Sequence, residues 1–181
     1  TELIVPLTEY VLERAWTEAG LWQQRHPLVR VAINVSARNL QDRTFPKAIA
    51  AALARRDFPG SLLELEITEN AVMSNPQKVA AVLEVIEQLG VKLSIDDFGT
   101  GYSSLASLRD LPVETVKIDR SFVMDLVDDD GDHAIVSAIV DLAHSLGLTT
   151  VAEGVETLDA HERLAKMGCD LVQGYLVARP M

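Results

Sequence analysis

Six short apolar runs recur along the chain, and each brings a polar side chain close to its C-terminal end. The runs span residues 31–35, 62–67, 93–97, 115–119, 150–154 and 170–174. Amphipathic patterns with helical spacing precede or separate them, at residues 5–19, 45–55, 76–89, 132–146 and 158–167. Strands that alternate with helices pair in parallel, because each helical crossover returns the chain to the same end of the sheet.

The position of the polar residues narrows the choice of fold. The carboxyl ends of parallel strands meet at one edge, as they do on the catalytic face of a TIM-type (β/α)8 barrel. We therefore expect an α/β chain of this type, incomplete here, with about six of the eight barrel strands present. A doubly wound open sheet is the alternative, since it also binds ligands at strand ends. That fold would not need a metal-type ligand at the end of every strand.

The polar side chains also follow the two-residue period of a strand. Residues i and i+2 share a face of the sheet. Glu64 and Glu66 are therefore expected to point together, as are Lys117 and Asp119. Asn34, Asp96 with Asp97, Glu153 and Gln173 complete the set at the other strand ends.

Two adjacent carboxylates, Asp96 and Asp97, end the run that begins at Leu93. A glycine-rich loop follows, and Ser103 with Ser104 is expected to open a helix after it. Like charges at a buried strand end need a counter-charge, and a divalent metal with oxygen ligands commonly supplies it. A solvated turn between strand and helix is the alternative if this segment is considered alone.

Composition favours one globular domain. The chain has 181 residues, of which 48% are hydrophobic, enough for a substantial core. No apolar stretch reaches the ~18 residues of a membrane span, and no signal peptide is visible, so we expect a cytoplasmic domain, with any tether outside these residues. A net charge of −11 argues against DNA binding. The single cysteine, Cys169, is expected to be a buried reduced thiol.

Several conspicuous residues have ordinary explanations. The acidic run at residues 128–132 does not fit the register of a calcium-binding EF-hand, and we expect a solvated loop in which Asp132 caps the next helix. Trp16 and Trp22 are expected to pack. The histidines show no ligand spacing and are expected on surfaces or helix faces: His26, His133, His144 and His161.

Six segments together resemble one known family. They are NVSAR at 34–38, ELEITE at 64–69, DDFGTGYSS at 96–104, KIDRSF at 117–122, AEGVET at 152–157 and QGY at 173–175. In this order, and over essentially the whole chain, they resemble the EAL-domain phosphodiesterases, which hydrolyse the bacterial second messenger cyclic di-GMP. The resemblance implies a metal-dependent enzyme of bacterial signal transduction whose product is the linear dinucleotide pGpG.

The resemblance also implies a set of metal ligands and catalytic residues. The expected ligands of one Mg²⁺ or Mn²⁺ are Asn34, Glu66, Asp96 and Glu153, and Asp97 would help to hold a second ion. Lys117 would orient or help to activate the attacking water, with Glu153 and Asp97 also in the catalytic set. Hard oxygen ligands suit these cations, and a pair of them can stabilise an in-line displacement at phosphorus.

Further residues are implied for substrate binding or for anchoring the loop at 98–104. Gln173 would lie beside the metals or the phosphate, and Glu156 would contact the nucleotide. Glu69 would anchor the loop, which in this family shapes the second metal site and the dimer contact. Asp119, Gly99, Thr100 and Gly101 complete the set. The implied partners are cyclic di-GMP, a second copy of the chain, and regulatory domains upstream.

One departure from the family pattern concerns the Glu-Ala-Leu motif itself, whose glutamate is a further metal ligand. No such motif occurs here, and Glu2 precedes a helix rather than ending a strand. We therefore expect residues 1–181 to be one EAL-type barrel domain truncated at its N-terminus, inactive on its own. The alternative function is a catalytically inactive EAL domain that binds cyclic di-GMP as a sensor or interaction module.

Overall fold

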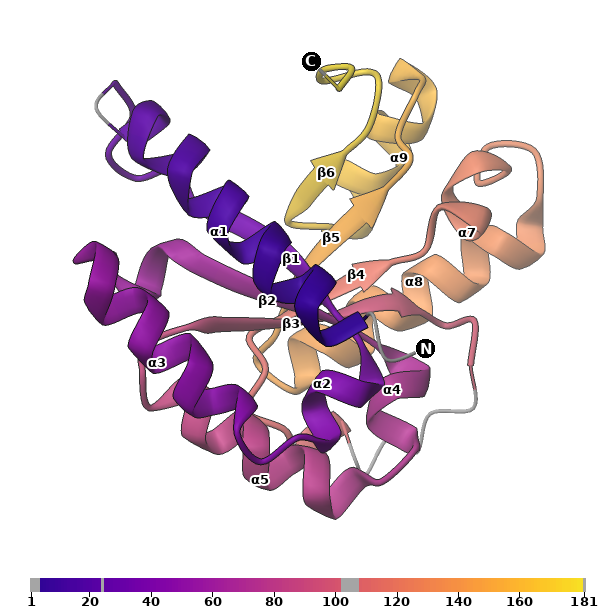
Figure 1. Ribbon diagram of the computed structural model, residues 1–181. Helices are drawn as coiled ribbons and strands as arrows, with labels where there is room; N and C mark the ends of the chain where they lie inside the picture. Colours follow the sequence, from indigo (N-terminus) through magenta and orange to yellow (C-terminus); the bar gives the residue numbers. More distant parts are fainter. Residues whose placement is uncertain (1–3, 24, 102–107, 181) are drawn as a thin grey trace.

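The computed structural model describes residues 4–23, 25–101 and 108–180. Six strands form one parallel sheet whose spatial order follows the chain order (Figure 1). The strands are β1 (Val31–Val35), β2 (Leu63–Thr68), β3 (Lys92–Phe98), β4 (Thr115–Ile118), β5 (Thr149–Glu153) and β6 (Leu171–Gln173). A doubly wound sheet reverses its strand order at a switch point. The consecutive order seen here therefore excludes that alternative and confirms the predicted α/β class, as a curled half-barrel.

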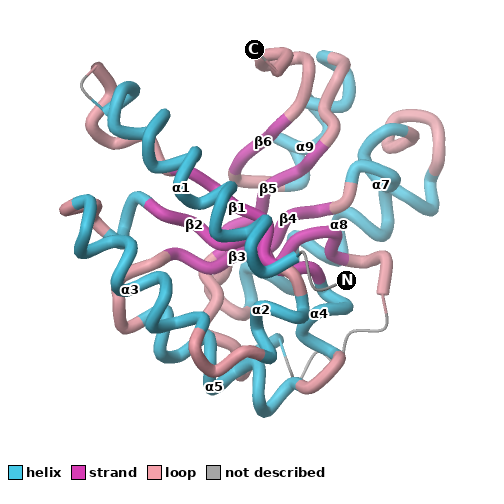
Figure 2. Tube along the Cα trace, viewed as in Figure 1, coloured by secondary structure: helices cyan, strands magenta, loops and turns pink. Residues whose placement is uncertain are grey.

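Helices surround the curled sheet and cover its outer side (Figure 2). They are α1 (Ile4–Gln23), α2 (Ala37–Gln41), α3 (Phe45–Arg56), α4 (Glu69–Met73), α5 (Pro76–Glu87), α7 (Arg120–Met124), α8 (Asp130–Ser145) and α9 (Leu158–Met167), with a short 3-10 turn at Gly60–Leu62. In the described part of the chain, no helix combines the length and the apolar character needed to cross a membrane.

Strand alternation decides which side chains join the core. In β1, Val31, Ile33 and Val35 are buried, whereas Ala32 and Asn34 are exposed on the opposite face. The buried set packs with the apolar faces of the helices into one hydrophobic core. The opposite face is therefore free to carry polar groups.

The strand register aligns these polar groups. Asn34 lies opposite Glu66 in the β1–β2 pair, and Glu153 lies opposite Gln173 in the β5–β6 pair. The β3–β4 pair changes register between Ile95 and Phe98, at the Asp96–Asp97 pair. The carboxyl ends of the strands thus bring their polar residues to one edge.

Helix α8 begins two residues earlier than the sequence pattern predicts. Asp129, and not Asp132, is its N-cap: the Asp129 carboxylate accepts hydrogen bonds from the amides of Gly131 (2.6 Å) and Asp132 (3.1 Å). The prediction of Asp132 as the cap was wrong because several aspartates in a row are equally good caps in sequence. By contrast, α9 has the predicted bounds and ends at Gly168, whose φ is 84°.

Other predictions have mixed outcomes. Trp16 is buried at 3% exposure, but Trp22 is half exposed at 50%. Cys169 is a free thiol and only partly buried. Ser103 and Ser104, expected to open a helix, lie outside the described residues.

Candidate active site

Lys117 is the centre of an ionic cluster at the carboxyl ends of the strands. Its Nζ lies 2.6 Å from Glu66 Oε1, 3.3 Å from Asp96 Oδ1 and 2.5 Å from Glu153 Oε1. The four residues come from β4, β2, β3 and β5, so the parallel sheet itself assembles the cluster. Three carboxylates share one ammonium, which leaves the cluster with an excess of negative charge.

Burial and pairing act in opposite directions on these groups. Burial would lower the pKa of the Lys117 ammonium, but its hydrogen bonds to Glu153 and Glu66, and the nearby charge of Asp96, outweigh burial and raise that pKa. Burial raises the pKa of the Glu66 carboxyl, even though Lys117 acts to lower it. Lys117 therefore remains a cation, and the carboxylates around it compete for it.

Asp97 joins the cluster because of its backbone conformation. Adjacent residues in a regular strand point to opposite faces. Asp97 has φ of 54°, in the left-handed region, at the register change in β3. One carboxylate oxygen each from Asp96, Asp97 and Glu153 consequently lies within 4.8 Å of the others. Burial, followed by the charges of Asp96 and Asp119, raises the pKa of Asp97.

The unpaired oxygen of Asp96 points to a cation. Asp96 Oδ1 is buried and has no hydrogen-bond donor among the described residues, and its 3.3 Å approach to Lys117 lacks hydrogen-bond geometry. Buried oxygens without a donor are rare in native structures. Asn34 Nδ2 donates to Glu66 Oε2 at 3.2 Å, and no described residue donates to the Asn34 amide oxygen. These are hard oxygen donors, and they fit Mg²⁺ or Mn²⁺.

Glu69 contacts the loop that follows Asp97. It is 2% exposed, and its Oε2 accepts a hydrogen bond from the Gly99 amide at 3.0 Å. A Cβ atom at Gly101 would lie 2.6 Å from Glu69 Oε1, so a larger residue there would displace the Glu69 carboxylate. Thr100 donates through Oγ1 to the carbonyl of Asp97 at 2.9 Å. Glu69 thus lies against the backbone that carries the Asp97 carboxylate.

The remaining predicted residues lie at the margin of the cluster. Asp119 caps α7 and accepts a hydrogen bond from the Ser121 amide at 2.9 Å. Burial would raise the pKa of Asp119, but the hydrogen bonds from Ser121 outweigh it and lower that pKa. Gln173 is exposed beside Glu153. Glu156 is exposed on the loop after β5 and has no ion pair with any described residue.

Two features of the site were not predicted from the sequence. Strand alternation predicts only that Glu64 points to the same face as Glu66. It does not predict the ion pair that Glu64 forms with Arg30 at 3.5 Å. A Cβ atom at Gly154 would lie 2.6 Å from Arg120 Cβ, so this glycine lets the loop after β5 pass close to α7. The available signal for the second feature was a glycine directly after a strand-end glutamate.

Comparison with known proteins identifies relatives over the whole chain. A family model described as the EAL domain matches residues 1–180. The chain is 40% identical over 181 residues to the cyclic di-GMP phosphodiesterase PA2567 of Pseudomonas aeruginosa, covering 100% of this chain and 31% of that protein. It is 37% identical over 179 residues to the cyclic di-GMP phosphodiesterase PdeR of Escherichia coli, covering 99% of this chain and 27% of that protein. The chain thus spans less than a third of either relative.

Solved structures show the same fold. The PaMucR phosphodiesterase in complex with c-di-GMP is similar with a TM-score of 0.95 and 43% identity, over 99% of this chain and 73% of that chain. The EAL domain of Mycobacterium smegmatis DcpA is similar with a TM-score of 0.92 and 39% identity, over 97% of this chain and 80% of that chain. A family match of this extent, together with these structural similarities, shows that the chain belongs to the EAL-domain family.

Proposed function

We propose that the protein containing this chain is a phosphodiesterase that hydrolyses cyclic di-GMP to linear pGpG with the help of Mg²⁺ or Mn²⁺. The observation that carries the proposal is the cluster of Asp96, Asp97 and Glu153 beside the ammonium of Lys117. A sensor without catalysis has no need of paired carboxylates beside a buried lysine. The names of the relatives, and of the nucleotide in the PaMucR complex, support the same substrate.

The donor atoms divide between two proposed cation positions. The first ion would be held by Asn34, Glu66, Asp96 and Glu153, and the second would be held with the help of Asp97. When bound, such cations polarise the phosphodiester and lower the pKa of a coordinated water.

Lys117 is proposed to act as a hydrogen-bond donor in the reaction. Carboxylates approach its Nζ from three strands, and they hold the ammonium in place. An ammonium offers donors and no acceptor. Lys117 would therefore orient the attacking water and stabilise charge that develops on the phosphate oxygens, while proton acceptance is left to a carboxylate.

The surrounding residues are proposed to position the substrate and the loop. Through its contact with Gly99, Glu69 would hold the Asp97 backbone in its left-handed conformation. Asp119 fixes the start of the helix after Lys117. Gln173 would lie next to the phosphate, and Glu156 would contact the nucleotide from its exposed loop. We also propose that the domain pairs with a second copy of itself and that domains upstream control its activity.

Product analysis of the full-length protein that contains these residues tests the function. With Mg²⁺ or Mn²⁺ we expect cyclic di-GMP to be converted to pGpG, as identified by chromatography and mass spectrometry. Ca²⁺ should inhibit, because its longer and looser coordination displaces the water. Undiminished turnover in excess EDTA would contradict metal dependence. Calorimetric binding of cyclic di-GMP without any hydrolysis would instead favour a sensor.

A further inference from the structure

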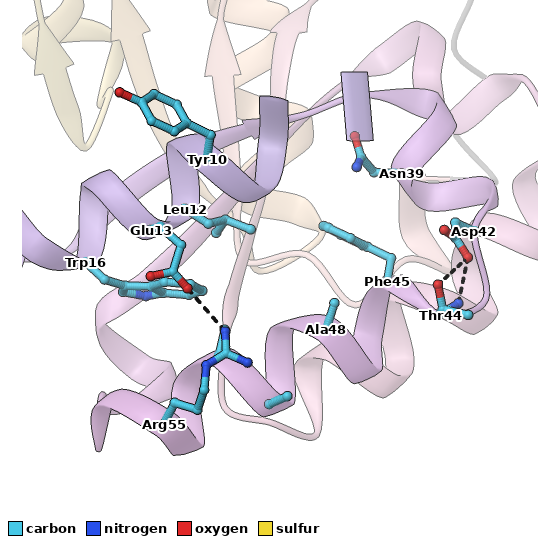
Figure 3. Close-up of a pocket in the computed structure, with 12 residues that line it drawn as sticks. Tyr10, Leu12, Glu13, Trp16, Asn39, Asp42, Thr44, Phe45, Ala48 and Arg55 are labelled. Atoms are coloured by element: carbon cyan, nitrogen blue, oxygen red, sulfur yellow. Dashed lines mark hydrogen bonds and ion pairs between the residues drawn. The ribbon is translucent and has the colours of Figure 1, made fainter. Parts of the chain in front are cut away.

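A hollow of about 530 Å³ opens between α1, α2 and α3, and none of its lining residues belongs to the carboxylate cluster (Figure 3). Small-molecule sites have volumes of roughly 300–1,000 Å³ and are mostly apolar with a few convergent polar groups. The hollow has this size.

The inner surface of the hollow is apolar and aromatic. Trp16 from α1 and Phe45 from α3 enter it from opposite ends, with Leu12 between them (Figure 3). All three side chains are buried. On the α3 side, the small residues Ala48 and Ala51 leave the space open. Apolar side chains along the hollow, with an aromatic ring at each end, favour an apolar ring as the occupant.

Two polar groups belong to the lining: the buried indole nitrogen of Trp16, which has no hydrogen-bond partner among the described residues, and the side-chain amide of Asn39. Asn39 is 1% exposed, and its Oδ1 accepts hydrogen bonds from Thr8 Oγ1 (3.2 Å) and Ser36 Oγ (2.5 Å). Its Nδ2 has no partner among the described residues, and Figure 3 shows the amide turned toward the hollow. An amide donor that faces the hollow in this way is available to an acceptor on an occupant. A primary carboxamide on the occupant would complement it, because it carries both an acceptor and donors.

The charged residues at the rim already have partners. The Glu13 carboxylate pairs with Arg55 at 3.1 Å and with Arg56 at 2.5 Å, and these arginines lower its pKa. Asp42 Oδ1 accepts hydrogen bonds from the amide and the hydroxyl of Thr44, at 2.8 and 2.7 Å. Each described charged side chain of the rim thus already has an ion-pair or hydrogen-bond partner, and this favours an uncharged ligand.

From these contacts we propose that the hollow between α1, α2 and α3 binds a small, uncharged aromatic carboxamide. The ring lies against Leu12, in the space bounded by Trp16 at one end and Phe45 at the other, and the amide group meets the side chain of Asn39. The site is separate from the carboxylate cluster, and the proposal does not depend on the proposed phosphodiesterase activity.

Benzamide is the probe, and ligand-observed NMR by saturation transfer is the measurement. We expect saturable binding with a dissociation constant on the order of 1 mM, which is typical of so small a ligand. Toluene, which lacks the amide, should bind about tenfold more weakly. Equal binding of the two compounds would overturn the role given to Asn39.

Variants that fill the hollow with larger side chains test whether benzamide binds there. Ala48→Leu and Ala51→Leu, made singly and together, add volume at exposed positions of α3 and should weaken or abolish benzamide binding. Ala54→Leu, on the same helix and also exposed but outside the lining, is the matched control and should bind as the parent does. Absence of saturable binding to the parent protein, or binding that survives in all the filled variants, would overturn the proposal. Circular dichroism verifies that each variant is folded.

Discussion

Carboxylates at the two ends of the sheet differ in their hydrogen-bond donors and in the direction of their pKa shifts. At the amino end, Asp170 Oδ2 accepts hydrogen bonds from the amide and hydroxyl of Thr150, both at 2.8 Å, and lies 2.9 Å from His144 Nε2. These contacts outweigh burial and lower the pKa of Asp170 to about 2. At the carboxyl end, Asp96 has a buried oxygen without a donor, and the pKa of Asp97 is raised.

This difference separates a stabilising site from a functional one. A carboxylate with a full set of donors favours the folded state, whereas carboxylates that share one ammonium cost stability unless something else neutralises them. In barrels of this type, catalysis gathers at the carboxyl end and stability at the amino end. Substitutions at the two ends of the sheet test that division.

Loss of the central ammonium should have the largest effect on activity. Lys117→Ala in the full-length protein is expected to lower kcat by on the order of 10²–10³, with a much smaller change in nucleotide affinity, because its role lies in the transition state. Calorimetry and single-turnover rates separate the two quantities. Lys92→Ala, which breaks an ion pair with Glu114 at the amino end of β3, is the control and should leave kcat unchanged. If the variant binds the nucleotide more weakly but keeps a normal single-turnover rate, Lys117 only balances the charge of the carboxylates.

Neutralising one strand-end carboxylate should raise the stability of the metal-free protein and abolish its activity. Asp96→Asn removes a charge from the excess around Lys117, so without metal its thermal unfolding temperature is expected to rise, by the equivalent of about 1 kcal/mol. Mg²⁺ should stabilise the parent, by about 2.7 kcal/mol at one hundred times its dissociation constant. The variant should lose that response together with its activity. An equal response to Mg²⁺ in both proteins would remove Asp96 from the ligand set.

A smaller loss is expected from the loop contact. Glu69→Ala removes the acceptor for the Gly99 amide and should lower activity by about tenfold, through a looser Asp97 position rather than through unfolding. Steady-state rates across a Mg²⁺ titration measure this. Glu87→Ala, at an exposed position of α5, is the control. Full activity with an unchanged Mg²⁺ dependence would show that the loop needs no such anchor.

The smallest effect should come from the amino end and should spare catalysis. Asp170→Asn is expected to lower the free energy of unfolding at pH 7 by on the order of 1 kcal/mol. Because the folded pKa of Asp170, about 2, is below the unfolded value, the contribution is present above pH ~4 and disappears as the pH falls toward 2. Urea unfolding at several pH values should show the parent and the variant converging in acid. A constant difference down to the lowest pH would contradict this assignment.

The fold was largely predictable because alternation and spacing determine faces and ends. The run at 31–35 is a strand with the predicted bounds, and the other five strands begin and end within one or two residues of their predicted limits. Spacing does not determine distances across strands. It could not reveal that Glu66, Asp96 and Glu153 all approach Lys117, or that Asp97 adopts a left-handed conformation. The pairing of Glu64 with Arg30 depends on side-chain conformations that no periodicity encodes.

The consecutive order of the strands has a consequence for synthesis on the ribosome. Each strand pairs with the one made just before it, so the sheet can grow as the chain emerges, without waiting for distant segments. Glu66 and Asp96 are made before Lys117, and Glu153 follows it. A nascent chain that ends after β3 therefore carries its repelling carboxylates without the ammonium that separates them. The electrostatic balance of the site is reached only when β4 and β5 have joined the sheet.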